Sequence, residues 1–250
     1  MAFSGREPDR TSPWRARQKR ILTRSVLSIG IAAPVLLNAF QYYAAATTPH
    51  YDWVSQTISH LASPGMPHPV DMQVAIVSYH FAMILLAFLS WRLVGHDRRL
   101  LPGFFFLIFY IACGLSTGFF RDDSNAVVAF GATAGTVHSY SAYFALAVFG
   151  LTVLAFAGGT FLNRQWRWFP EISLVLFVLG MSAALPLPLD VWRDWHGALE
   201  RIVFFWAGMW IAVFSFYVFK VGSRPQQPRM VRESGDGQRP HRWRQIRHQG

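Results

Sequence analysis

The sequence predicts an all-α fold: a polytopic transmembrane helical bundle of six spans, with the N-terminus and the C-terminus both cytoplasmic. Three observations lead to this prediction. Apolar side chains make up 52% of the 250 residues, and they are concentrated in blocks of about twenty separated by short polar loops. The Lys and Arg residues gather in alternate loops. The period-2 alternation of a transmembrane barrel is absent, so the spans are expected to be helical.

Six segments meet or nearly meet the length of about 20 helical residues that crosses a bilayer. They are approximately 21–45, 72–94, 101–120, 136–158, 171–187 and 199–221. The first is too long for the core of a signal peptide and lacks a convincing cleavage site, so we interpret it as a retained span. The fifth is the shortest and ends in Leu185-Pro186-Leu187-Pro188, where two prolines disfavour further helix.

The basic residues predict the orientation and the domain limits. Twenty of the 23 Lys and Arg lie near the two ends of the chain and in the second-to-third and fourth-to-fifth connections; only Arg121, Arg193 and Arg201 lie in the alternate loops. Because cytoplasmic loops are enriched in Lys and Arg, we expect a basic cytoplasmic arm (1–20), a six-span domain (21–221) and a basic, disordered cytoplasmic tail (222–250). The arm could form a helix on the inner leaflet or serve only to set the topology.

The charge and the single cysteine limit the partners and cofactors that we expect. The net charge is +10, but it is concentrated at the two ends, where it predicts binding to anionic inner-leaflet lipid rather than to nucleic acid. Membrane lipids are the expected partners, and protein partners are not predicted. Cys113 is the only cysteine, which excludes a disulfide within the chain and a thiolate metal cluster. The sequence has no pair of His residues placed deep in facing spans, so we expect no haem.

Titratable residues gather on the predicted outer face, where ionisable groups at the ends of spans are costly unless paired. The loop 51–65 is rich in Ser, Thr, His and Gly, which suits a packed cap over the bundle or a short interfacial helix. Asp122 follows the third span and His138 opens the fourth, so the two could approach each other across the hairpin. They would then form a catalytic base with its orienting carboxylate, or part of a metal site. The alternative for His138 is a structural hydrogen bond between helices.

A second cluster opens the sixth span. His196 and Glu200 are one helical turn apart and therefore share a face. Together with His138 they could supply three ligands of a Zn²⁺ site that keeps a fourth position open for water. Equally, Glu200 and Arg201 could form a structural ion-pair set at the head of this span.

The same residues give the chain a resemblance to a known family. The motifs are Tyr51-Asp52, Thr57-Ile58-Ser59-His60-Leu61 and Gly65 after the first span, Phe120-Arg121-Asp122 after the third, Gly135 and His138 in the fourth, and Gly197, Glu200 and Arg201 in the sixth. In order and placement they resemble the six-span bacterial and archaeal membrane proteins catalogued as domain of unknown function 998. The resemblance covers roughly residues 20 to 220. It implies the fold and residence in a membrane, and it implies no established activity.

The leading functional hypothesis is a multi-pass protein of the cell membrane with an outward-facing polar pocket. Its expected lining is Asp52, Ser59, Asp122, His138, His196, Glu200 and Arg201. If the protein is an enzyme, we expect a hydrolase or transferase acting on a lipid or an envelope precursor, with His138 and Asp122 as the catalytic pair. The expected substrate-binding residues are Asp52, Ser59, Arg121 and Arg201, the last receiving an anionic head group. The competing hypothesis is a non-catalytic binding, transport or accessory subunit.

Overall fold

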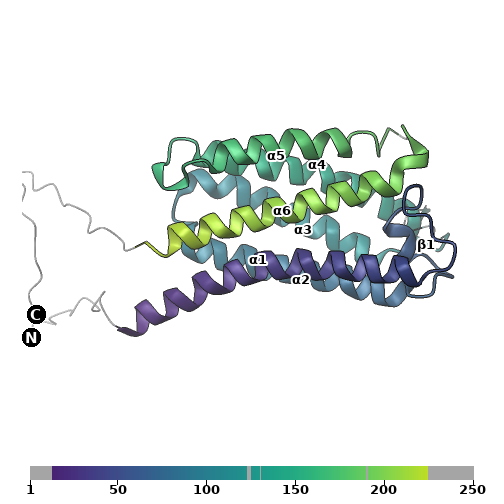
Figure 1. Ribbon diagram of the computed structural model, residues 1–250, viewed down its shortest axis with the longest axis horizontal. Helices are drawn as coiled ribbons and strands as arrows, with labels where there is room; N and C mark the ends of the chain where they lie inside the picture. Colours follow the sequence, from purple (N-terminus) through teal and green to yellow (C-terminus); the bar gives the residue numbers. More distant parts are fainter. Residues whose placement is uncertain (1–12, 123–124, 130, 190, 225–250) are drawn as a thin grey trace, which may run out of the picture.

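The computed structural model describes residues 13–122, 125–129, 131–189 and 191–224, and within them six long helices run the length of the molecule (Figure 1). The long helices are α1 (Pro13–Thr47), α2 (Pro69–Val94), α3 (Leu101–Phe119), α4 (Ala134–Thr160), α5 (Phe169–Ala184) and α6 (His196–Gly222). Short 3-10 helices are η1 (Ser59–Ala62), η2 (Arg98–Leu100), η3 (Arg164–Trp166) and η4 (Arg193–Trp195). The predicted all-α polytopic bundle is confirmed. One small hairpin, β1 (Val127–Ala129) and β2 (Ala132–Thr133), was not predicted.

Five of the six described helices are long and apolar enough to cross a membrane, and α5 is the shorter one. Its 16 residues extend about 24 Å at 1.5 Å per residue, less than the roughly 30 Å of a hydrocarbon core. The helix ends at Ala184, three residues before the predicted end at Leu187. The physical reason is Pro186, because a proline has no backbone N–H with which to continue the helical hydrogen bonds.

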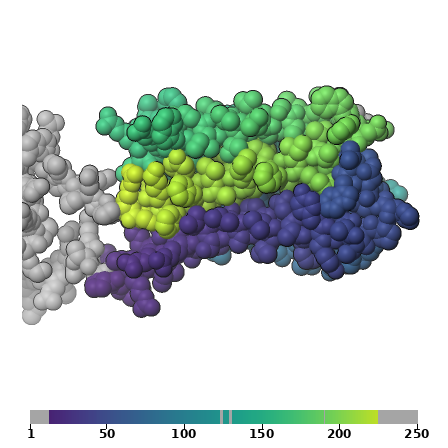
Figure 2. All heavy atoms as spheres, in the orientation of Figure 1, coloured from purple at the N-terminus to yellow at the C-terminus, as the bar shows by residue number. Residues whose placement is uncertain are grey.

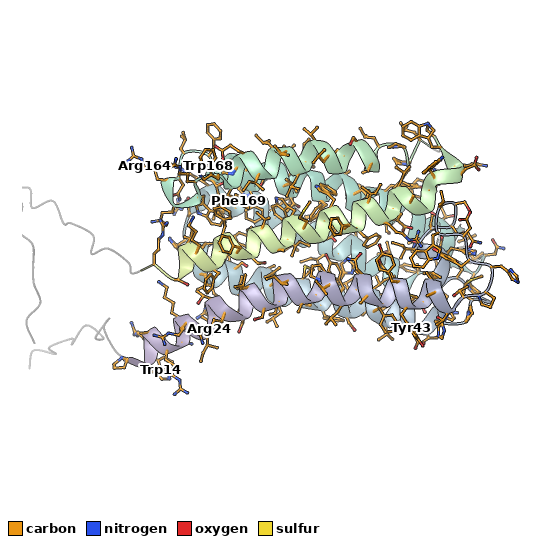
Figure 3. The ribbon with its side chains drawn as sticks, in the orientation of Figure 1. Trp14, Arg24, Tyr43, Arg164, Trp168 and Phe169 are labelled. Atoms are coloured by element: carbon orange, nitrogen blue, oxygen red, sulfur yellow. The ribbon has the colours of Figure 1, made fainter. Side chains whose placement is uncertain are left out.

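The helices alternate in direction, and each packs against its neighbour in sequence, while α6 also packs against α1 and closes the bundle. The start of α1 and the end of α6 therefore lie at the same end, which we call the inner end, following the orientation predicted from Lys and Arg (Figure 1). Figure 3 shows Trp14, Arg24, Arg164 and Trp168 at this inner end and Tyr43 at the opposite, outer end. Residues 1–12 of the arm, and 225–250 of the tail for which we expect disorder, lie outside the described part of the chain.

Aromatic side chains fill the bundle from its middle to the inner end. Trp210 and Phe214 of α6 stack with their ring centroids 5.4 Å apart, and Phe214 contacts Phe156 of α4 at 4.7 Å. All three side chains are buried, and the Trp210 indole donates a hydrogen bond of 3.0 Å to the Ser173 hydroxyl on α5. Lipid tails are as apolar as these rings, so packing and such hydrogen bonds hold the helices together rather than the hydrophobic effect. The bundle is consequently close-packed around these rings.

At the outer end, the loop between α1 and α2 docks on the first turns of α6. The Ala198 amide donates a 3.0 Å hydrogen bond to the Val54 carbonyl, so loop backbone runs directly over the helix. Gly197 allows this approach, because a Cβ added there would collide with the Gln56 carbonyl oxygen. The predicted cap over the bundle is therefore present, and η1 forms part of it.

Arg201 fastens the same loop from the next turn of α6. Its guanidinium Nη1 donates to the carbonyl oxygens of Trp53 (2.9 Å) and Gln56 (3.2 Å), and Nη2 donates to the Tyr51 hydroxyl (2.7 Å). The guanidinium also lies over the rings of Trp53 and Tyr51 at 5.1 and 5.5 Å. Burial raises the pKa of Tyr51, against the opposing effect of Arg201, so this hydroxyl stays neutral at physiological pH. Hydrogen bonds from the Ser55 hydroxyl and the Val54 amide lower the pKa of Asp52, which caps a turn of the loop.

Replacing Arg201 with Ala should release this loop. The variant loses charge-assisted hydrogen bonds to three loop groups, so we expect the free energy of unfolding to fall by about 2–4 kcal/mol. Thermal unfolding in detergent and the rate of chymotrypsin cleavage within residues 48–68 measure the two effects. Arg164→Ala is the control, because it removes the same charge from an exposed site at the inner end. Equal melting temperatures and cleavage rates for the two variants would contradict a docking role for Arg201.

Candidate functional site

A cavity of about 180 Å³ lies in the outer half of the bundle. Its walls come from α2, α3, α4 and α6, from the docked first outer loop, and from Leu187 just after α5. The volume is room for about six water molecules, so the cavity fits a small molecule or one end of a larger one. Most of its lining is apolar, and the polar side chains in it other than Tyr and Trp are Thr57, Ser59, His80, Thr117, Asp122, His138, Ser139, His196 and Glu200.

His138 lies in the second turn of α4, and its position is set by local structure. The Thr133 side chain caps α4 by accepting a 3.1 Å hydrogen bond from the Thr136 amide. The imidazole is 3% exposed, and its Nδ1 lies 2.8 Å from the Phe120 carbonyl oxygen and 3.1 Å from that of Thr117. A carbonyl oxygen only accepts, so Nδ1 carries the hydrogen and Nε2 of the neutral ring keeps its lone pair. Among the described residues, Nε2 has no hydrogen-bond partner.

Glu200 joins the cavity to the docked loop. One carboxylate oxygen accepts from the Ile58 amide, and the other accepts from the Ser59 hydroxyl at 3.1 Å. Both partners lie in or next to η1, and both residues line the cavity. A carboxylate at this depth needs such donors, because an unpaired ionised group at the end of a span is costly. Glu200 therefore holds the wall of the cavity as well as contributing to it.

The structure brings most of the predicted site residues together. Asp122, in the turn after α3, and His196, the first residue of α6, line the same cavity as His138, Glu200 and Ser59. One detail differs from the expected catalytic pair. The ring nitrogen of His138 that an orienting carboxylate would bind is held by the backbone carbonyls of Phe120 and Thr117. Asp122 contributes its charge to the cavity without being the group that fixes Nδ1.

Three predicted substrate-binding residues lie outside the cavity lining. Asp52 is exposed and accepts hydrogen bonds within its own loop, and Arg201 binds that loop as described above. Arg121 donates from Nε to the Gln73 side-chain oxygen at 3.1 Å, which links the end of α3 to α2. Their hydrogen bonds hold the outer end together, and a contact with substrate stays a prediction for them.

The residues proposed for zinc do not fit a three-ligand site. Within the described residues there is no group of three or more His, Cys, Asp or Glu side chains that could hold a metal ion. His138, His196 and Glu200 line one cavity, but the carboxylate of Glu200 is occupied by Ile58 and Ser59.

His80 and Trp206 are two of the cavity residues that were not assigned to the site from sequence. His80 of α2 directs Nδ1 to the Ile76 carbonyl oxygen at 2.8 Å, the same arrangement as in His138, and its ring packs on Gly114. Trp206 of α6 packs against Gly180 of α5, and its buried indole N–H has no hydrogen-bond partner in the described part of the chain. Trp206 lies in an apolar span, where a tryptophan in the sequence does not indicate a binding site. Only the position of His80 within a span could have indicated one.

Comparison with known proteins adds a family to this description. Residues 31–217 match the family described as Protein of unknown function (DUF998). No curated protein and no solved structure matches the chain. The matched range covers well over half of the 250 residues and contains every residue found to line the outer cavity. The chain is thus a multi-pass membrane protein that belongs to the DUF998 family.

Proposed function

We propose that this protein binds the polar end of an amphiphilic molecule in the outer cavity and cleaves an ester or amide bond in it, with His138 as the general base. The observation that carries the proposal is the setting of His138, whose Nδ1 is held by backbone carbonyls while Nε2 has no partner among the described residues. Asp122, His196 and Glu200 line the same cavity. Perturbed or constrained titratable groups in one cavity are typical of reactive sites.

The lining supports an amphiphile as the ligand. Ser59, Asp122 and Glu200 give the cavity a polar part, while side chains such as Phe149 and Val203 give it an apolar part. Tyr143 of α4 lines the cavity and is also 39% exposed on the bundle surface, so the wall is thin on the side that faces lipid. A lipid of the outer leaflet of the cell membrane has both a polar and an apolar part, and it has the shortest path to this wall.

Charge restricts the class of polar end. No Lys or Arg is among the described residues that line the cavity, whereas Asp122 and Glu200 are both there. An anionic group such as a phosphate would gain no cationic partner and would meet two carboxyl groups. We therefore favour a neutral or cationic polar end. The anionic head group expected for Arg201 is less suitable, since its guanidinium is bound to the outer loop.

In the proposed hydrolysis of an ester, His138 acts first as a base and then as an acid. His138 Nε2 takes a proton from water, and the water oxygen forms a bond to the acyl carbon. The bond from that carbon to the alcohol oxygen then breaks, and the imidazolium returns the proton to the leaving alcohol. Trp206 supplies an N–H donor for the carbonyl oxygen, where negative charge develops, and Asp122 favours the imidazolium. With an alcohol in place of water, the same steps transfer the acyl group.

Substituting His138 with Asn tests the base directly. The Asn amide N–H can replace Nδ1–H as donor to the Phe120 carbonyl, but no atom replaces Nε2. We expect His138→Asn to fold with an unchanged melting temperature and to lose about 10²–10⁴-fold in turnover. Turnover is measured by mass spectrometry in proteoliposomes that contain diacylglycerol or, for comparison, phosphatidic acid. The matched control is His50→Asn, which changes an exposed residue outside both cavity linings and should retain activity.

Diacylglycerol should be the better substrate, because it lacks the phosphate that the cavity disfavours. Undiminished turnover in His138→Asn would overturn the assignment of the base. If wild type cleaves neither lipid but co-purifies with a neutral amphiphile that His138→Asn also retains, the protein is a binding subunit. That second function is favoured by one observation, that both oxygens of Glu200 serve the docked loop.

Trp206→Phe removes one N–H and keeps an aromatic ring. Because that N–H has no partner among the described residues, its loss should not lower the melting temperature. If it binds the ligand, kcat/KM or the affinity should fall about 10-fold, as expected for one lost hydrogen bond. Trp210→Phe is the matched control, since its N–H is bonded to Ser173. That variant should lose about 1 kcal/mol of stability and keep its activity. The reverse pattern would contradict a ligand-binding role for Trp206.

A further inference from the structure

A second cavity, of about 950 Å³, lies at the inner end of the bundle. It is bounded by the start of α1, the end of α2, the end of α6 and Gln165 of η3. Figure 1 shows that the start of α1 diverges here from the other helices, and Figure 2 shows it beside the end of α6. The two cavities share no lining residue among the described residues.

The lining of the inner cavity is strongly basic. Four cationic side chains contribute, namely Arg15 and Lys19 of α1, Arg92 of α2, and Arg224 after α6, and His96 lies beside them. No Asp or Glu is among the described residues that line it. Cations gathered in one concavity repel each other and create a positive potential, which an anion in the cavity would relieve.

We propose that this inner cavity is a binding site for the phosphate-bearing head group of an anionic lipid of the inner leaflet. Guanidinium groups match phosphate oxygens with paired hydrogen bonds, and an ammonium adds a point charge. Basic hollows between transmembrane helices on the cytoplasmic side are well suited to such head groups. The site is independent of the reaction proposed for the outer cavity.

Apolar lining residues favour a lipid over a soluble phosphate. Leu22 of α1, Leu93 of α2 and Val221 of α6 lie next to the cations, so the cavity continues into the apolar part of the bundle. Trp14, at the rim, is 67% exposed and has the amphipathic character of residues at a membrane interface. An acyl chain attached to the bound phosphate would contact these side chains, whereas a soluble ion would not.

The walls of the inner cavity are held in place by close contacts. Lys19 Nζ donates a 2.9 Å hydrogen bond to the Arg224 carbonyl oxygen, which ties α1 to the end of α6. One turn deeper, α1 and α6 meet where a Cβ added to Gly222 would lie 2.9 Å from the Thr23 methyl group. The ammonium group of Lys19 keeps two further N–H donors for a ligand. The cationic side chains are therefore carried by helices that are fixed to one another.

The test compares two doubly substituted full-length proteins that have the same net charge. Lys19→Gln/Arg92→Gln removes two cations from the inner cavity, and Arg98→Gln/Arg164→Gln removes two from other inner-end positions outside its lining. Native mass spectrometry and thermal shift in detergent measure binding of phosphatidylglycerol, with phosphatidylcholine as the zwitterionic comparison that has no net charge. At about one kcal/mol per cation, we expect roughly 30-fold weaker phosphatidylglycerol binding in the first variant and little change in the second.

Equal losses in both variants would mean general attraction to the basic end and would overturn the site. Inorganic phosphate and glycerol 3-phosphate form a separate arm. If either stabilises the wild type as much as phosphatidylglycerol does, the ligand is a soluble phosphate and the lipid assignment fails. Because Lys19 also bonds to α6, Arg92→Gln is compared singly with Arg98→Gln if the first double variant does not fold. An unchanged lipid affinity in Arg92→Gln would again overturn the proposal.

Discussion

The docking of the first outer loop on the start of α6 is the interaction on which the outer half of the molecule depends. Two consecutive residues of opposite charge, Glu200 and Arg201, hold the loop. The first accepts a hydrogen bond from a backbone amide, and the second donates hydrogen bonds to backbone carbonyls. Glu200 accepts from the Ile58 amide, and Arg201 donates to the carbonyls of Trp53 and Gln56. Adjacent helical side chains diverge by about 100°, so the pair reaches two parts of one loop. The loop backbone thereby obtains partners that a membrane interior would not supply, and Ser59 is fixed in the cavity wall.

The cavity also depends on how differently the two halves of the bundle are filled. In the middle of the bundle, rings such as Trp210 and Phe214 interdigitate and leave little space. Toward the outer end, α5 stops at Ala184, and among the described residues of the proline-rich segment after it, Leu187 alone lines the cavity. An α5 of full length would bring more side chains to this corner. The early end of α5 is thus one reason why a cavity with some polar lining persists beside a close-packed core.

The helices were predictable because each span needs a long apolar block, and a block of that length has few alternatives in lipid. The hairpin of β1 and β2 was not, since strands of three and two residues have too few positions to show a period. His196 and Glu200, which the sequence places one helical turn apart, line the same cavity as Asp122 and His138. The partner of His138 Nδ1 was hidden because it is a backbone carbonyl, which every residue possesses. Arg121 and Arg201 were assigned to substrate because their charge is visible in the sequence, whereas their loop and helix partners are not.

The two cavities differ in charge in the direction that membrane topology imposes. Lys and Arg are excluded from outer loops during insertion, so an outer cavity has few cations to draw on. The cationic Arg201 at that end is already bound to carbonyl oxygens, and the acidic residues Asp122 and Glu200 remain in the lining. The inner cavity takes its cations from the segments that fix the orientation, as Lys19 and Arg92 illustrate. The same distribution of charge from which the orientation is predicted therefore gives the inner cavity a cationic lining, which favours anions, and the outer cavity an acidic one, which disfavours them.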